Sequence, residues 1–152
     1  MKTNLLFITV ISLIIFSCNN AKNEKEAIPT ETRSLAGTWE HTSTYKYVNG
    51  KINDTVKVKT DSRQIKIYTD SKIMWCKHVK ADSTDWFGYG NYTIKGDTLT
   101  EILEYGSRTM IPHIAYNDTF TFKLDLNEDS YNQLTIDDKG NKLFAENYRR
   151  IK

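Results

Sequence analysis

The sequence of 152 residues predicts an all-β fold, a single up-and-down antiparallel β-barrel of about nine strands over residues 34–152. Three observations indicate this fold. Short runs of β-type residues alternate with turn signals, and apolar and polar residues alternate with a period of two within those runs. No stretch after residue 17 keeps a helical period for more than ten residues. Because an open sheet of nine strands would leave two unpaired edges, we expect the sheet to close.

Residues 1–17 have the composition of a targeting segment rather than of a barrel strand. Lys2 gives a minimal positive region, and an apolar run follows from Leu5 to Phe16. As a helix this run would span about 18 Å, which is well short of the roughly 30 Å hydrocarbon core of a bilayer. We therefore expect a signal peptide and not a membrane span.

The four residues Ile15-Phe16-Ser17-Cys18 follow the apolar run. A Cys after a signal segment and a small residue resembles a bacterial lipobox. The resemblance implies that Cys18 is acylated on sulfur and becomes the first residue of a mature lipoprotein. The alternative is an ordinary cleaved signal peptide that ends near Ala21.

Residues 18–33 have the composition of a flexible tether. Asn19 to Arg33 has no aromatic residue, one Pro and charges of both signs, so it has too little apolar surface to fold. Acyl chains contribute about 0.8 kcal/mol per buried methylene and would hold the following domain at a membrane. With Cys18 acylated, Cys76 has no partner for a disulfide, and the barrel is expected to depend on its core alone.

Turn signals divide residues 34–152 into nine candidate strands. The signals lie at 49–50, 60–62, 70–71, 81–84, 96–97, 106–118, 127–130 and 137–141. Asn49-Gly50 is the strongest, because both residues tolerate the positive φ that a tight hairpin requires. Gly88 and Gly90 lie within a candidate strand, where glycine often marks a bulge or a bend.

The period-two pattern assigns side chains to the two faces of these strands. One face of residues 118–126 carries Phe120, Phe122, Leu124 and Leu126. One face of residues 97–105 carries Leu99, Glu101, Leu103 and Tyr105. The apolar pairs that continue the pattern are Ile65 with Ile67 and Ile73 with Trp75. The apolar connection 106–118 is either a lid over one mouth of the barrel or a short irregular edge strand.

The first candidate strand opens with Gly37-Thr38-Trp39, and the last ends with Arg149-Arg150. Gly-x-Trp at this place resembles the lipocalin signature, and residues 68–75 and 90–101 are similar to lipocalin-like (calycin-type) bacterial lipoproteins. The resemblance implies that Trp39 packs under an Arg of the last strand and closes the barrel base. Arg150 is the expected partner, because it shares strand parity with Tyr148. The resemblance also implies a barrel that binds a small apolar or amphipathic molecule.

The period-two pattern also predicts a ligand wall of inward-facing residues. This set is His41, Trp75, Tyr92, Glu101, Tyr105 and Phe122. Glu101 interrupts an apolar face, and burying a carboxylate costs several kcal/mol unless the charge is paired or hydrogen-bonded. Glu101 is therefore either a polar anchor for a ligand or part of a structural network with tyrosines, Arg150 or water.

Two patterns that resemble metal sites lack the necessary ligands. Asp125 to Asp129 imitates the start of a calcium loop, but Ser130 stands where Gly is needed and Ile136 where a bidentate Glu is needed. Cys76 and His78 share a strand face, but zinc requires three or four ligands. We therefore expect no metal and no cofactor, with an acidic turn at the first site and a small core thiol beside a solvated His at the second.

The charge pattern and the missing motifs narrow the function. The formal net charge is +2, with 21 basic residues scattered among 19 acidic ones, which argues against nucleic acid as a partner. No nucleophile elbow or phosphate loop is present, so an enzyme ranks third. The leading hypothesis is a membrane-anchored barrel of the bacterial cell envelope, on the periplasmic or surface side, that carries or sequesters a small apolar or amphipathic molecule. The second hypothesis is a filled barrel that binds envelope proteins, and a hollow barrel would favour the first.

Overall fold

A computed structural model describes residues 33–81 and 83–152. The targeting segment, Cys18 and the tether before residue 33 lie outside the described residues. The described chain contains nine strands and one short helix. In order they are β1 (Gly37–Val48), β2 (Lys51–Lys57), β3 (Ser62–Tyr68), β4 (Lys72–Val79), β5 (Thr84–Lys95), β6 (Thr98–Gly106), α1 (Ile111–Tyr116), β7 (Thr119–Leu126), β8 (Ser130–Ile136) and β9 (Lys142–Ile151). The predicted all-β, up-and-down antiparallel fold is confirmed.

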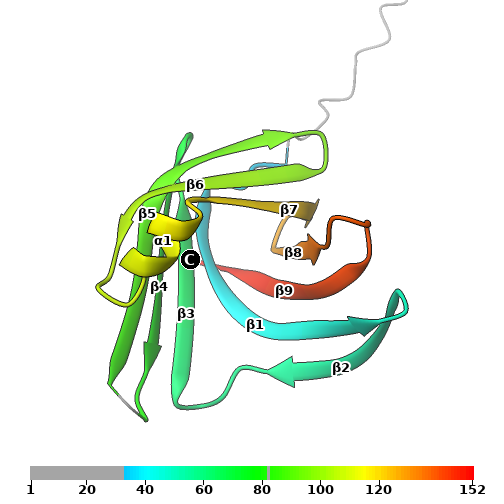
Figure 1. Ribbon diagram of the computed structural model, residues 1–152, viewed down its shortest axis with the longest axis horizontal. Helices are drawn as coiled ribbons and strands as arrows, with labels where there is room; N and C mark the ends of the chain where they lie inside the picture. The colour runs from blue at the N-terminus through cyan, green and yellow to red at the C-terminus, as the bar shows by residue number, and fades with distance from the viewer. Residues whose placement is uncertain (1–32, 82) are drawn as a thin grey trace, which may run out of the picture. The chain divides into compact units, whose positions relative to one another are not determined.

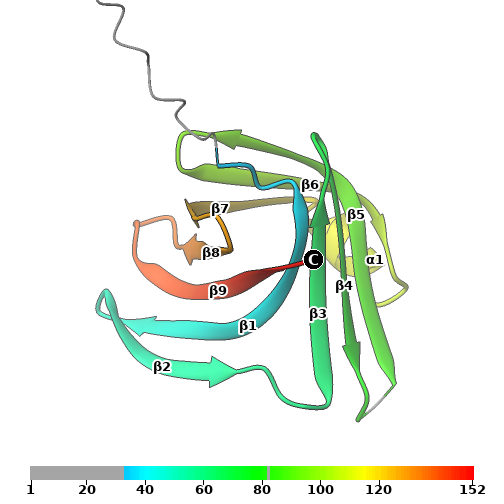
Figure 2. The same cartoon turned by 180° about the vertical axis from the view of Figure 1, so that it is seen from behind.

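The sheet closes because β1 pairs along both of its edges. Neighbouring strands follow the order β2-β1-β3-β4-β5-β6-β7-β8-β9, and β9 returns to pair with β1. Residues 37–40 of β1 pair with β3, whereas residues 43–48 pair with β2. The ring therefore consists of β1 and β3–β9, and β2 extends the far half of β1 as a hairpin (Figure 1). Figure 2 shows the same hairpin from behind, next to β9.

The hairpin between β1 and β2 has the turn that the sequence predicts. Asn49 and Gly50 have φ values of 51° and 74°, both in the left-handed region. Two successive residues of this kind are typical of the tight turns whose twist matches that of the flanking strands. Val48 pairs with Lys51 across this turn.

The base of the barrel is a filled aromatic core. Trp39 is 0% exposed, its indole nitrogen donates a 2.8 Å hydrogen bond to the Leu35 carbonyl oxygen, and its ring meets Tyr131 edge-on at 4.9 Å. The Arg150 guanidinium lies 4.0 Å from the centre of the Trp39 ring. The other buried apolar residues are Leu35, Tyr68, Ile73, Leu99, Leu103, Met110, Tyr131, Ala145 and Tyr148.

The connection between β6 and β7 contains the helix α1 and is not an edge strand. The helix starts after Met110, with Pro112 in its first turn, where proline is well tolerated. Met110 is buried, and the His113 ring lies 5.7 Å from the Trp86 ring of β5. The segment therefore packs against the inner side of β5 and β6, which agrees with the lid interpretation. Within the described residues, no helix is long and apolar enough to cross a membrane.

Candidate functional site

The barrel contains an open cavity of about 480 Å³ above its filled base. This volume lies within the range of small-molecule sites in proteins. The apolar side chains that line the cavity are Trp75, Trp86, Leu103, Met110, Phe120 and Phe122. The polar ones are Gln64, Lys66, Lys77, Glu101, His113, Gln133 and Glu146. The apolar residues come mainly from β5–β7 and the polar residues mainly from β3, β8 and β9, so the cavity has an apolar wall and a polar wall.

Alternation along each strand explains how the base gives way to the cavity. On β3, Tyr68 lies in the core, Lys66 is the next inward residue, and Gln64 follows it. On β6, Leu99 lies in the core and Glu101 comes next. Inward side chains on one strand are two residues apart. The change from the apolar core to the polar floor therefore takes place between one inward residue and the next.

The polar floor is a buried ion pair between β3 and β6. The Lys66 Nζ atom donates to both carboxylate oxygens of Glu101, at 2.8 and 3.1 Å, and to Gln133 Oε1 at 2.9 Å. Both charged side chains are 4% exposed. Tyr68 donates a further 2.5 Å hydrogen bond to Glu101. A buried ion pair is tolerated when additional hydrogen bonds satisfy its polar atoms, and here three acceptors use all three N–H groups of Lys66.

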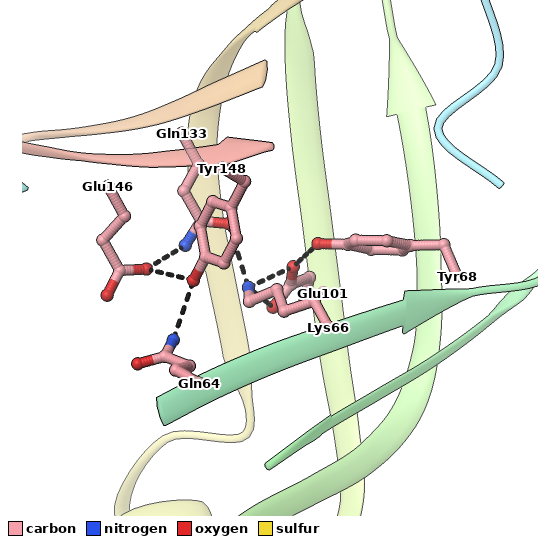
Figure 3. A network of polar contacts seen from close by, with 7 residues as sticks. All are labelled: Gln64, Lys66, Tyr68, Glu101, Gln133, Glu146 and Tyr148. Atoms are coloured by element: carbon pink, nitrogen blue, oxygen red, sulfur yellow. Dashed lines mark hydrogen bonds and ion pairs between the residues drawn. The ribbon is translucent and has the colours of Figure 1, made fainter. Parts of the chain in front are cut away.

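A second carboxylate, Glu146 on β9, continues this network toward the mouth of the cavity (Figure 3). Its Oε2 atom accepts hydrogen bonds from Gln133 Nε2 at 2.7 Å and from the Tyr148 hydroxyl at 3.0 Å. Gln64 Nε2 in turn donates to the Tyr148 hydroxyl oxygen at 2.7 Å. Two neutral donors, from β8 and β9, therefore fix the position of the half-buried Glu146 carboxylate, and Gln64 of β3 supports one of them.

Burial keeps the phenols of the barrel interior neutral. Desolvation raises the pKa of Tyr68 and that of Tyr148 well above the usual value, and the nearby negative charges of Glu101 and Glu146 act in the same direction. Both hydroxyls therefore act as donors to carboxylates. Burial also lowers the pKa of His41, an effect that the charge of Glu146 opposes.

The apolar wall depends on a glycine that makes room for an indole. A side chain at Gly88 would begin with a Cβ atom 2.7 Å from Trp75 Nε1, closer than real Cβ contacts. The Trp75 indole therefore lies against the β5 backbone at Gly88, and any residue larger than glycine at that position would displace the indole. Phe122 of β7 also lines the cavity, and its ring centroid lies 5.6 Å from Lys66 Nζ.

The structure brings half of the predicted ligand wall together. The three predicted residues that line the cavity are Trp75, Glu101 and Phe122. His41 lies against the Tyr148 ring at 5.3 Å and hydrogen-bonds to Thr44, outside the cavity lining. Tyr92 also lies outside it, and its hydroxyl donates to the Thr69 carbonyl oxygen.

The inward direction predicted for Tyr105 is wrong, because a β-bulge changes the parity of β6. Tyr89 pairs with Tyr105, whereas its neighbour Gly90 pairs with Leu103, so Glu104 is an extra residue between the two pairs. After the bulge, side chains point to the opposite face. Tyr105 is consequently 55% exposed and packs against Tyr89 on the outer wall.

The face assigned to Ile65 and Ile67 is likewise reversed. Ile67 is 44% exposed, whereas Lys66 between the two isoleucines is buried. The apolar pattern alone favours isoleucine inside, but the carboxylate of Glu101 stabilises a lysine there instead. The structural network expected around Glu101 does include a tyrosine, Tyr68. The charged partner of Glu101, however, is Lys66 and not Arg150.

Sequence analysis also missed Gln64, Gln133 and Glu146. Gln133 is two residues from the buried Tyr131, and Glu146 is two from the buried Tyr148. A polar residue two positions from a buried aromatic residue points to the same face of the strand, and this spacing is the signal that would have identified both residues.

Cys76, expected as a core thiol, is exposed on the outer wall. His78 is exposed there too, and it bonds Asp85.

Comparisons with known proteins support the fold. No protein-family model and no curated protein matches this chain. Among solved structures, a lipocalin-like protein from Bacteroides uniformis ATCC 8492 is similar with a TM-score of 0.54 and 20% identity, over 77% of this chain and 98% of that one. An uncharacterized protein from Bacteroides eggerthii DSM 20697 is similar with a TM-score of 0.53 and 15% identity, over 78% of this chain and 100% of that one. The barrel therefore has a lipocalin-like fold.

Proposed function

We propose that this protein is a lipid-anchored barrel of the bacterial cell envelope that binds a small amphipathic molecule in its cavity, as a carrier or a sequestering protein. The observation that carries the proposal is the open cavity of about 480 Å³ with one apolar and one polar wall. A molecule with an apolar body and a polar head matches both walls. The anchor is inferred from the signal-like segment and the Cys18 motif.

The cavity favours this function over a filled barrel that only binds envelope proteins. A filled barrel requires large inward side chains in every layer. Here the aromatic residues fill the base, around Trp39 and Tyr131, and leave the volume above Lys66 and Glu101 open. The residues around that volume bind rather than react in this proposal, since their charges and hydroxyls hold one another in place.

Native mass spectrometry tests the binding function directly. The chain from residue 19 onward keeps the whole compact unit Thr32–Lys152 and its core. It is purified without detergent, incubated with an envelope extract and sprayed under native conditions. We expect a mass increase from one small molecule. We expect Phe122→Ala to weaken that adduct and Tyr105→Ala, on the outer wall, to leave it unchanged.

A chain that retains no small molecule from the extract, and that also fails to bind the apolar fluorescent probe N-phenyl-1-naphthylamine, would contradict the proposal. The interaction-module hypothesis would then take its place.

A further inference from the structure

Among the described residues, the polar wall contains one carboxylate oxygen that accepts no hydrogen bond from the protein, on Glu146. Lys66 has three N–H groups, and Glu101 and Gln133 accept all of them. In contrast, the two protein donors to Glu146 both bond its Oε2 atom. Glu146 Oε1 therefore has no hydrogen-bond donor within residues 33–81 and 83–152. A ligand group that meets this carboxylate oxygen must supply a donor.

The charges of the cavity also favour a positively charged ligand group. The Lys66 and Glu101 charges compensate each other in the floor. Glu146 receives only neutral donors, and no cationic side chain of the described chain lies within 4.0 Å of it. His41 is near enough to sense the Glu146 charge, but burial favours its neutral form. The cavity therefore presents one fixed carboxylate without an ion-pair partner among the described residues, and the charges of Lys77 and Lys66 act on the same His41 imidazole.

Lys77 is the other charged residue of the cavity whose charge is not compensated. It extends from β4 and is half-buried. No hydrogen bond or ion pair is found for its ammonium among the described residues. Unlike Glu146, it is held by no neighbour, so fixing its position would cost side-chain entropy. A preorganised carboxylate is the better recognition element of the two.

The apolar wall offers aromatic surface, and the Phe122 ring already lies 5.6 Å from the Lys66 ammonium. Trp75 and Phe122 present aromatic rings to the same cavity, and aromatic faces attract cations within about 6 Å. The same rings provide apolar contact area for a flat hydrocarbon body.

We propose that the cavity selects molecules that carry a protonated amine on an aromatic or other apolar body, with the ammonium on Glu146 and the body against Trp75 and Phe122. This inference rests on the proposed binding function and names its ligand class.

Three indole compounds of similar shape test the charge preference by isothermal titration calorimetry at pH 7. They are tryptamine, which is cationic, tryptophol, which is neutral, and indole-3-propionate, which is anionic. We expect tryptamine to bind at least tenfold more tightly than tryptophol, and indole-3-propionate to bind most weakly. Raising the salt concentration should weaken tryptamine binding more than tryptophol binding, because an ion pair in an open cavity is screened.

Variants separate the two charged residues of the cavity. Glu146→Gln should reduce tryptamine affinity to that of tryptophol, whereas Lys77→Met should raise tryptamine affinity, because it removes a positive charge from the cavity. Glu104→Gln, which alters an exposed carboxylate on the outer wall, is the matched control and should change neither affinity. The salt dependence of the unmodified chain provides the same test if Glu146→Gln does not fold.

Tryptamine that binds no more tightly than tryptophol, or that does not bind, overturns the amine preference. So does indole-3-propionate that binds most tightly and is weakened by Lys77→Met. In both cases the binding function stands if N-phenyl-1-naphthylamine still enters the cavity. Failure of this probe as well would instead remove the proposed function.

Discussion

Arg150 covers the indole of Trp39 at the base of the barrel, with 4.0 Å between the guanidinium carbon and the ring centre. The same guanidinium donates hydrogen bonds to the carbonyl oxygens of Ala36 at 2.8 Å, Ser34 at 2.9 Å and Glu128 at 2.8 Å. One side chain of β9 therefore holds the segment before β1 and the turn between β7 and β8 over the closed end of the core.

Removing this side chain should destabilise the barrel. We expect Arg150→Ala to lower the free energy of unfolding by about 1–3 kcal/mol, because the variant loses both the cation–π contact and the packing of the aliphatic stem. Arg149→Ala, which removes an exposed ion pair with Glu40, should cost under about 0.5 kcal/mol. Urea unfolding of the two variants measures the difference. A larger loss for Arg149→Ala would contradict the closure role of Arg150.

The floor of the cavity should respond to mutation as a buried ion pair does. Glu101→Gln leaves the Lys66 charge without its partner, and we expect a loss of about 3–5 kcal/mol and a lower melting temperature with or without ligand. The double variant Lys66→Met, Glu101→Leu should recover most of this loss, because neither charge is then buried. A Glu101→Gln protein that melts like the unmodified chain would show that the pair does not stabilise the fold.

The strand count and the first hairpin could be predicted because they depend on local patterns. The closed sheet followed from the cost of unpaired edges, and the contact of Trp39 with Arg150 was implied by the resemblance to lipocalins. The turn at Asn49-Gly50 and the alternation in β7 can be recognised within one segment of the sequence, without knowledge of which strand pairs with it. The cavity floor could not be predicted in the same way, because Lys66 is buried only where Glu101 of a distant strand meets it. The direction of Tyr105 depends on a bulge at Glu104, which alternation along a single strand does not reveal.

The pH dependence of stability should include a contribution from His41. Burial lowers its pKa in the folded barrel, so the unfolded chain, with a pKa of about 6.5, binds the proton more readily. Stability from this residue is therefore complete above about pH 6.5 and is lost as the pH falls from there through the lower folded pKa.

Urea unfolding at pH 7.5 and at pH 5.5 tests this contribution. We expect His41→Gln to lose less stability between the two pH values than the unmodified chain does. Identical pH dependence in the His41 variant and the unmodified chain would contradict the assignment.

The anchor proposal concerns residues before the barrel and needs a test in cells. If Cys18 carries the acyl chains, Cys18→Ala should move the protein from the membrane fraction to the soluble envelope fraction. Cys76→Ala, at the exposed thiol of β4, should leave membrane association unchanged. Cell fractionation followed by immunoblotting measures both variants. Continued membrane association of the Cys18 variant would show that the anchor lies elsewhere.

The two glycines of β5 should separate binding from folding. A Cβ atom at Gly90 would lie 1.9 Å from the Ile102 backbone carbonyl oxygen, which cannot move without breaking the pairing of β5 with β6. We therefore expect Gly90→Ala to destabilise the barrel strongly. A Cβ atom at Gly88 instead meets the Trp75 indole at 2.7 Å, and a side chain can shift.

Because the indole of Trp75 lines the cavity, Gly88→Ala should push it into the space that a ligand would occupy. The expected result is a folded protein with a modest loss of stability and a clear loss of affinity for N-phenyl-1-naphthylamine. Thermal unfolding and fluorescence titration of the same samples measure the two effects. Unchanged affinity in Gly88→Ala would mean that Trp75 does not border the bound molecule, and the apolar contacts would then have to come from other lining residues such as Phe120 and Phe122.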